Sequence, residues 1–155
     1  MNRTTSDPII RFRRLHPERD GDLPLPQYMS PGASGLDLPA AVEKDVVLAP
    51  GEIRLIPTGL AIAIPPGFEG QVRPRSGLAL KHGIGLINSP GTIDWDYRGE
   101  IGLAMINLGV RSYTIRRGDR LAQLVINRVY QARIQLVEDL DSTDRADGGF
   151  GHSGI

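Results

Sequence analysis

The sequence predicts an all-β fold, a sandwich or barrel of short strands that forms one domain. Nineteen glycines and twelve prolines interrupt the chain, and the apolar runs between them are short, as is typical of strands joined by tight turns. A length of 155 residues suits a single domain that buries about two-thirds of the surface of its unfolded chain. The expected molecule is therefore a turn-rich barrel with little helix.

Nine apolar runs predict the strands in chain order. The run Leu60–Ile64 is an example of a strand that ends at a turn, because Pro65-Pro66-Gly67 follows it directly. The nine runs are Ile9–Leu15, Val46–Leu48, Glu52–Pro57, Leu60–Ile64, Gln71–Arg73, Ile84–Ile87, Ile101–Asn107, Ser112–Ile115 and Leu121–Val129.

One stretch, Ser76–His82, predicts a short helix. Ser76 is a candidate N-cap, and Gly83 is a candidate helix end. From Glu138 onwards the chain is acidic and then glycine-rich, so it is too polar to build a core of its own. We therefore expect a barrel domain over 1–137 and a flexible arm over 138–155.

The amino-acid composition argues against several classes of function. The chain has 18 basic and 18 acidic residues, so no bulk charge attracts it to nucleic acid or to a membrane. It has no cysteine, which excludes disulfides, thiolate metal sites and cysteine nucleophiles. The N-terminal residues do not resemble a signal peptide, and no apolar run is long enough to span a membrane. We expect a soluble, cytoplasmic protein.

The segment 91–99, Gly-Thr-Ile-Asp-Trp-Asp-Tyr-Arg-Gly, is the most informative part of the chain. In a strand, Asp94 and Asp96 would share one face, and Trp95 and Tyr97 would share the other. The glycines at both ends permit tight turns and the close approach of a ligand. We interpret the segment as a hairpin that holds a flat ring beside a carboxylate; the alternative is an ordinary polar hairpin tip.

A second candidate site begins at Arg73-Pro74-Arg75-Ser76-Gly77. Free backbone N–H groups and the positive end of the helix would face an anion there. Arg75 adds a guanidinium that can hold two phosphate oxygens, and Ser76 adds a hydroxyl. The alternative is a serine N-cap with arginines on the surface nearby.

Two polar residues interrupt apolar segments. Gln123 lies within a predicted strand, where a buried amide needs hydrogen-bond partners, and a structural glutamine is the alternative to a functional one. Asp37 lies between two leucines. It can be a buried hydrogen-bonded acid, or it can support the water shell of a metal ion.

The arm carries Arg145 and Phe150 among glycines. Its default interpretation is disorder. The alternative is an arm that closes over a ring-containing anion: Phe150 would stack on the ring, while Arg145 and the N–H groups of 148–151 would meet phosphate oxygens.

These stretches, in this order, resemble the five motifs of the trimeric dUTPase family. Three of them, Pro-Arg-Ser-Gly, Gly-x-Ile-Asp-x-Asp-Tyr-x-Gly and Gly-Gly-Phe-Gly-x-Ser-Gly, are each moderately specific and together are highly specific. The five matching stretches are Ala33–Ala40, Arg73–Leu80, Asn88–Gly99, Arg117–Val125 and Arg145–Gly154.

The resemblance implies a distorted jelly-roll-like β barrel that assembles as a homotrimer with shared active sites. One subunit would supply the hairpin for uracil, a second would supply the phosphate-binding residues from Arg75 to Gly77, and a third would supply the arm. The implied reaction is hydrolysis of dUTP to dUMP and pyrophosphate by water attack on the α-phosphorus. The resemblance also implies the role of the reaction, which would limit uracil incorporation into DNA and supply dUMP for thymidylate synthesis.

The resemblance also assigns roles to single residues. Asp94 would orient and deprotonate the water, and Ser76 would donate to the oxygen that leaves with pyrophosphate. Gln123, with Arg75 and Arg145, would hold the phosphates in line. Mg²⁺ would be bound by phosphate oxygens and waters, with Asp37 in contact only through water and no direct protein ligand.

Selectivity for the deoxyuridine nucleotide follows from the same resemblance. Asn88 and the hairpin backbone would match the edge of uracil, and Tyr97 would pack under the sugar and exclude a 2′-hydroxyl. The remaining residues of the implied site, which flank the nucleoside or belong to the closing arm, are Thr92, Ile93, Gly102 and Gly151. One departure from the family pattern is His152, which stands where Ser or Thr is common.

Two other functions compete with hydrolysis. A dCTP deaminase shares the barrel, but it needs a proton-shuttling acid at the base, and this chain carries its acid in the dUTPase-type motif. A nucleotide-sensing or protein-interaction module would be favoured by loss of Asp94 or of the arm, and both are present. A secondary role in binding a protein partner stays open.

Overall fold

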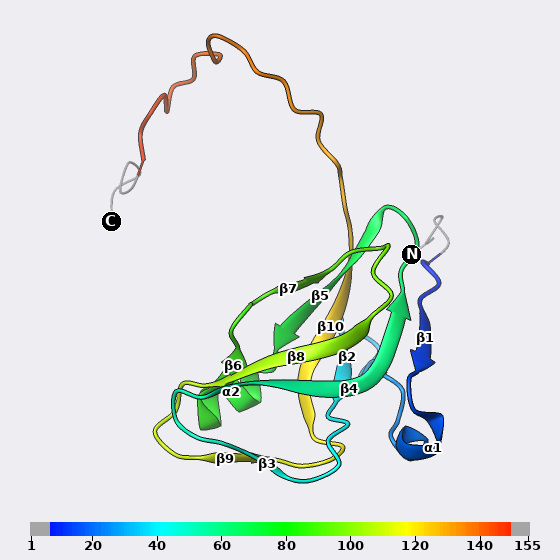
Figure 1. The fold of residues 1–155 in the computed structure, drawn as a ribbon. Helices are drawn as coiled ribbons and strands as arrows, with labels where there is room; N and C mark the ends of the chain where they lie inside the picture. Colours follow the sequence, from blue (N-terminus) through cyan, green and yellow to red (C-terminus); the bar gives the residue numbers. More distant parts are fainter. Residues whose placement is uncertain (1–6, 150–155) are drawn as a thin grey trace.

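The computed structural model describes residues 7–149 and consists mainly of antiparallel strands (Figure 1). One four-stranded sheet has the order β1-β4-β8-β6, a second has the order β2-β10-β5-β7, and β3 pairs with β9. The first sheet contains β1 (Arg11–Arg14), β4 (Ile53–Ala63), β8 (Glu100–Asn107) and β6 (Ile84–Leu86). The second contains β2 (Gly35–Pro39), β10 (Arg120–Arg128), β5 (Phe68–Pro74) and β7 (Gly91–Ile93). The small sheet contains β3 (Val46–Leu48) and β9 (Tyr113–Ile115).

A single apolar core joins the two large sheets. Ile56 and Leu103 from one sheet belong to the same buried cluster as Leu38 and Leu124 from the other, and none of the four is more than 1% exposed. Burial of each such side chain contributes about 1.5–3 kcal/mol relative to full exposure. Two antiparallel sheets around one core confirm the all-β, jelly-roll-like expectation.

The strand predictions differ from the structure at β4, β2 and β7. The runs 52–57 and 60–64 form one strand, β4, whose register against β8 shifts between Pro57 and Ala61. Gly59 lies at this shift with φ +68°, so the local turn signal marks an irregularity within one strand. Strand β2 is absent from the nine predicted runs because Asp37 interrupts its apolar pattern. Strand β7 is also absent from them, because only Gly91–Ile93 pairs in that segment.

Helix α2 (Ser76–His82) has the predicted bounds, and Gly83 ends it in the left-handed conformation at φ +69°. The expectation that Ser76 caps it is wrong. Arg75 is the N-cap, with extended backbone and no side-chain capping bond. Because the chain is still extended at Arg75, Ser76 falls inside the first turn, where its hydroxyl is not used as a cap.

A second helix, α1 (Pro17–Asp20), was not predicted, since four residues are too few to show a helical period. Asp20 at its end is 1% exposed and forms ion pairs with Arg19 at 2.8 Å and with Arg117 at 3.2 Å. Arg117 also pairs with Asp22 at 2.6 Å. Hydrogen bonding from Arg19, aided by Arg117, lowers the pKa of Asp20. These contacts hold the N-terminal segment to the β9–β10 turn.

After β10 the chain leaves the barrel (Figure 1). The Val129 N–H donates to the Gly67 carbonyl at 2.9 Å, and residues 129–147 are all exposed. Within residues 7–149, no helix has both the length and the apolar character needed to cross a membrane.

Candidate active site

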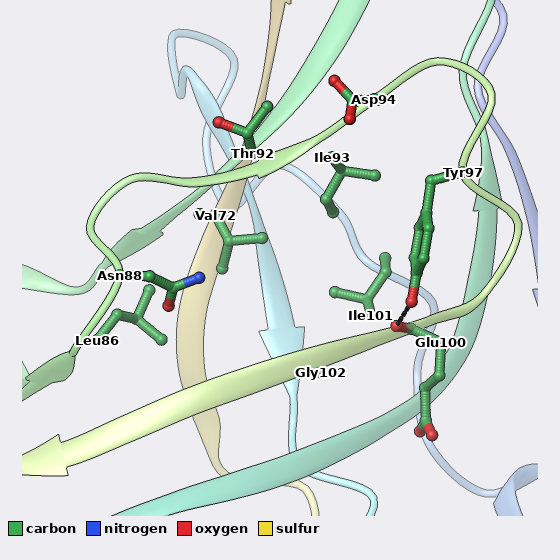
Figure 2. A pocket seen from close by; sticks show the side chains of 11 residues that line it. Val72, Leu86, Asn88, Thr92, Ile93, Asp94, Tyr97, Glu100, Ile101 and Gly102 are labelled. Carbon is green, nitrogen blue, oxygen red and sulfur yellow. Dashed lines mark hydrogen bonds between the residues drawn. The ribbon is translucent and has the colours of Figure 1, made fainter.

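A cavity of about 180 Å³ lies where β7 and β8 approach each other. Figure 2 shows the amide of Asn88 and the ring of Tyr97 on opposite sides of it, with apolar side chains between them. Six predicted site residues line it: Asn88, Thr92, Ile93, Tyr97 and Gly102, which were predicted to contact the nucleoside, and Asp94, which was predicted to activate the water. The lining is completed by Val72, Leu86, Gly91, Glu100 and Ile101, which the sequence analysis did not assign to the site.

Strand β7 sets which groups face the cavity. Gly91 and Ile93 are buried and Thr92 between them is exposed, so Ile93 points inward while the Thr92 side chain points away (Figure 2). A β-carbon at Gly91 would lie 3.1 Å from the amide nitrogen of Asn88. The glycine therefore leaves room for the Asn88 side chain.

The segment that carries Asp94 is a turn and not the expected strand. β7 ends at Ile93, and the Tyr97 N–H donates to the Asp94 carbonyl at 3.1 Å across a turn at 95–96. Asp94 and Asp96 therefore do not share a strand face. The hairpin interpretation is wrong as well, because β7 pairs with β5, whereas β8 pairs with β4 and β6. The turn connects the two sheets.

Two side chains fix the shape of this turn. The Tyr97 hydroxyl donates to the Glu100 carbonyl at 2.9 Å (Figure 2). Nη1 of Arg98 donates to the carbonyls of Trp95 and Tyr97, at 2.7 Å each. Within residues 7–149, the carboxylate of Asp94 has neither a hydrogen bond nor an ion pair, and it is exposed beside the cavity. Its oxygens are free to accept a hydrogen bond from water or from a ligand.

The residues predicted to bind phosphate form a separate cluster at the start of α2. Arg75 donates to the Arg120 carbonyl at 2.7 Å and pairs with Asp37 at 3.4 Å. Arg120 also reaches Asp37, at 3.1 Å. Gln123 pairs in register with Asp37 on β2 and donates to the Pro74 carbonyl at 3.1 Å. Ser76 and Gly77, both exposed, follow in the first turn of α2.

Two details of this cluster bear on its chemistry. Both arginines contact Oδ2 of Asp37, so Oδ1 is left to accept hydrogen bonds from water. Arg120 was not predicted as a site residue. It lies within the matching stretch Arg117–Val125 and begins β10, the strand that also carries Gln123. Within residues 7–149, no three acidic or histidine side chains gather closely enough to hold a metal ion.

Arg145 lies apart from both clusters. Its Nε donates to the Gly148 carbonyl at 2.9 Å, and its only hydrogen bonds within residues 7–149 are local. Phe150, Gly151 and His152 lie outside the described residues. The single chain thus brings together six predicted residues at the cavity and five at the start of α2 (Asp37, Arg75, Ser76, Gly77 and Gln123), with Arg145 separate.

Known proteins resemble this chain over nearly its whole length. The dUTPase family model matches residues 22–154. The deoxyuridine 5′-triphosphate nucleotidohydrolase of Thermoanaerobacter sp. (strain X514) is 60% identical over 147 residues, which covers 95% of this chain and 98% of that protein. That of Anaeromyxobacter sp. (strain Fw109-5) is 57% identical over 145 residues, 94% of this chain and 97% of that protein.

Solved structures agree with the sequence matches. The Staphylococcus bacteriophage 80alpha dUTPase with dUPNHPP has a TM-score of 0.82 at 27% identity, covering 95% of this chain and 99% of that one. A variant dUTPase from phage phi11 of S. aureus, described for coordination of a structural Mg(II) ion, has a TM-score of 0.75 at 27% identity, covering 86% and 99%. The chain belongs to the dUTPase family.

Proposed function

We propose that this chain is a dUTP diphosphatase, which hydrolyses dUTP to dUMP and pyrophosphate. The observation that carries the proposal is the cavity with the carboxylate of Asp94 beside it. Its volume of about 180 Å³ is below the about 300–1,000 Å³ of sites that enclose a whole ligand. It therefore suits the base and part of the sugar, with the phosphates outside.

Each bond that forms or breaks during hydrolysis gives a role to one of the candidate residues. Asp94 orients a water molecule and takes its proton as the water oxygen bonds to the α-phosphorus. The bond from that phosphorus to the oxygen bridging to the β-phosphate breaks, and pyrophosphate leaves. Ser76 donates its hydroxyl hydrogen bond to the leaving oxygen. Gln123 and Arg75 hold the phosphates in line, so catalysis is mostly positioning and charge stabilisation.

Selectivity for deoxyuridine arises at the walls of the cavity. Asn88 and the neighbouring backbone present donors and acceptors to the edge of uracil, and cytosine would leave some of them unpaired. The hydrogen bond from Tyr97 to the Glu100 carbonyl keeps the ring in place beneath the sugar. A fixed ring leaves no room for a 2′-hydroxyl. Thr92 contributes through its backbone, and Ile93 and Gly102 flank the nucleoside.

We propose that the active unit is a homotrimer. This is supported by the division of the candidate residues within one chain: the cavity and the α2 cluster share no lining residue, and Arg145 contacts neither. One copy supplies the cavity and another supplies Arg75, Ser76 and Gly77. The arm 138–155 of a third, beyond the barrel domain 1–137, closes the site with Arg145, Phe150 and Gly151.

The residues near α2 fit a magnesium ion bound to the triphosphate. A hydrated Mg²⁺ needs acceptors for its waters more than direct protein ligands. Oδ1 of Asp37 is free to accept such a hydrogen bond, while Oδ2 stays with Arg75 and Arg120. When bound, the ion neutralises charge that develops on the phosphate oxygens.

In the cell, this reaction removes a nucleotide that would place uracil in DNA and supplies dUMP for thymidylate synthesis. The test measures pyrophosphate release from dUTP, dCTP, dTTP and UTP, with and without Mg²⁺. We expect rapid, Mg²⁺-dependent release from dUTP alone. No release from any of the four by a folded protein would overturn the proposal, and ammonia release from dCTP would assign a deaminase instead.

A further inference from the structure

A second hollow, of about 680 Å³, lies at the other end of α2 from the phosphate cluster. It is formed by the C-terminal turn of α2, the β8–β9 loop and β9, and it shares no residue with the candidate active-site cavity. We call it the α2–β9 groove. Its lining residues are Lys81, His82, Gly83, Gly109, Val110, Arg111, Ser112, Tyr113, Thr114 and Arg116.

The charge of the α2–β9 groove is of one sign. Lys81, Arg111 and Arg116 line it, and no acidic residue from the described part of the chain does. Arg116 pairs weakly with Asp45 at 3.6 Å; within residues 7–149, Lys81 and Arg111 form no ion pair. Asp119, which accepts the Arg116 N–H at 2.8 Å, also lies at the Arg116 end. The positive field that attracts anions is therefore centred on Lys81 and Arg111.

The backbone of the groove is held in place from within the barrel. Asn107 is fully buried, and its amide donates to the carbonyls of Leu48 and Arg111, at 2.8 Å each. Its oxygen accepts the Gly109 N–H at 2.9 Å. The Leu108 N–H donates to the Gly83 carbonyl at 2.8 Å. These bonds fasten the β8–β9 loop to the end of α2, so the groove is preorganised for binding.

Hydroxyl and ring groups complete the lining. Ser112, Tyr113 and Thr114 each bring a hydroxyl, and hydroxyls commonly donate to phosphate oxygens. The rings of His82 and Tyr113 pack against each other with centroids 5.1 Å apart. The volume falls within the about 300–1,000 Å³ that is usual for small-molecule sites.

We propose that the α2–β9 groove binds an oligophosphate chain, either free or as the phosphate tail of a nucleotide. The cations Lys81, Arg111 and Arg116 neutralise the chain, and the neighbouring hydroxyls hydrogen-bond its oxygens. The proposal goes beyond the proposed hydrolysis and does not depend on it.

The test titrates the full chain with inorganic tripolyphosphate and follows the amide NMR signals of residues 109–114. These signals separate binding in the groove from binding near Arg75. The double variant Lys81→Gln with Arg111→Gln should lose affinity at these residues by about tenfold or more, because two charge-assisted contacts are removed. The matched control is Lys44→Gln with Arg133→Gln, which also removes one lysine and one arginine from exposed positions outside the groove.

The control should bind tripolyphosphate as the wild type does, and both double variants should hydrolyse dUTP at the wild-type rate. A parallel titration with dTTP distinguishes a nucleotide from a free phosphate chain as the ligand of the groove. Tighter binding of dTTP than of tripolyphosphate would mean that the groove also contacts the nucleoside. Equal affinities would mean that it contacts the phosphate chain alone. Absence of shifts at residues 109–114, or shifts of equal affinity in the Lys81/Arg111 variant, would overturn the proposal. Because the readout is binding in the groove, it stands even if the chain hydrolyses no dUTP.

Discussion

The cavity and the α2 cluster, the two halves of the candidate active site, are built in opposite ways. The cavity is fixed by backbone: Arg98 and Tyr97 donate to carbonyls of the turn beside it, while the Asp94 carboxylate is left without a partner among residues 7–149. In the cluster, charged side chains contact one another, since Arg75 and Arg120 both pair with Asp37. The cavity is thus shaped before a ligand arrives, whereas the arginines of the cluster would have to give up internal contacts in order to bind the phosphates of the proposed substrate.

The largest expected effect comes from the free carboxylate. Asp94→Asn should lower kcat for dUTP by about 10²–10⁴-fold, because an amide cannot take the proton of the attacking water. The fold and the binding of dUpNHpp should be retained, since Asp94 holds no side-chain contact within residues 7–149. Steady-state kinetics and calorimetry measure the two quantities. Turnover close to that of the wild type would contradict the assigned role and would leave the cavity as a binding site only.

Truncation of the arm after Arg145 tests whether the cavity and the α2 cluster are sufficient for turnover. A chain that ends before Ala146 should lower kcat/KM by about 10²-fold, because misplaced phosphates react slowly. It should keep its fold and its assembly, because the chain has already left the barrel before Ala146, and residues 129–147 are all exposed. Sedimentation of the truncated chain measures its assembly beside the kinetic assay. Loss of assembly would assign the arm a structural role in place of closure.

The turn after β7 shows how far the sequence could predict the site. The resemblance to a family motif identified six of the residues that line the cavity, and three of them, Asn88, Asp94 and Tyr97, lie close together along the chain. It did not predict the turn itself, since Asp-Trp-Asp-Tyr alternates as a strand does. Only the pairing of β7 with β5 and of β8 with β4 shows that the segment crosses between sheets.

Long-range contacts explain the other differences. Arg120 and Asp37 are 83 positions apart, and Arg117 and Asp20 are 97 positions apart. Neither pair leaves a local pattern, so a single sequence does not predict them. Helix α2 and the strands other than β2 and β7, by contrast, follow from apolar runs and turn residues nearby in the chain.

A smaller effect is expected at Arg98, which fixes the turn without entering the cavity. Arg98→Ala removes two charge-assisted hydrogen bonds to carbonyls, and we expect kcat/KM for dUTP to fall by about tenfold. The loss should appear mainly in kcat, because the turn positions Asp94. Arg98→Lys should restore part of it, since an ammonium can still donate to one carbonyl.

Arg133→Ala is the control for Arg98→Ala, because Arg133 is also exposed but lies in the segment after β10. It should leave both kinetic constants unchanged. An equal loss in kcat and in thermal stability for Arg98→Ala, with no rescue by lysine, would make Arg98 a structural residue only.

The smallest effect on turnover is expected at Asp20, which lies outside both halves of the site. The pKa of this carboxyl is lowered in the folded protein, first by hydrogen bonding from Arg19. A carboxyl with a lowered pKa adds stability above its unfolded pKa of about 3.9 and loses it as the pH falls through that value towards the folded pKa. Thermal melting should therefore show a fall in stability below about pH 4.

Asp20→Asn should reduce this dependence and should destabilise the fold at pH 7 by about 1–3 kcal/mol, because the buried side chain no longer forms charge-assisted hydrogen bonds with Arg19 and Arg117. The folded fraction should still turn over dUTP at the wild-type rate, since none of these residues lines the cavity. An unchanged dependence of melting temperature on pH would mean that the α1 contacts do not contribute to acid stability. A parallel loss of kcat in the folded fraction would mean that the N-terminal segment also sets the position of Arg120 or Gln123 on β10. In that case the α1 contacts would affect both the stability of the fold and the activity of the site.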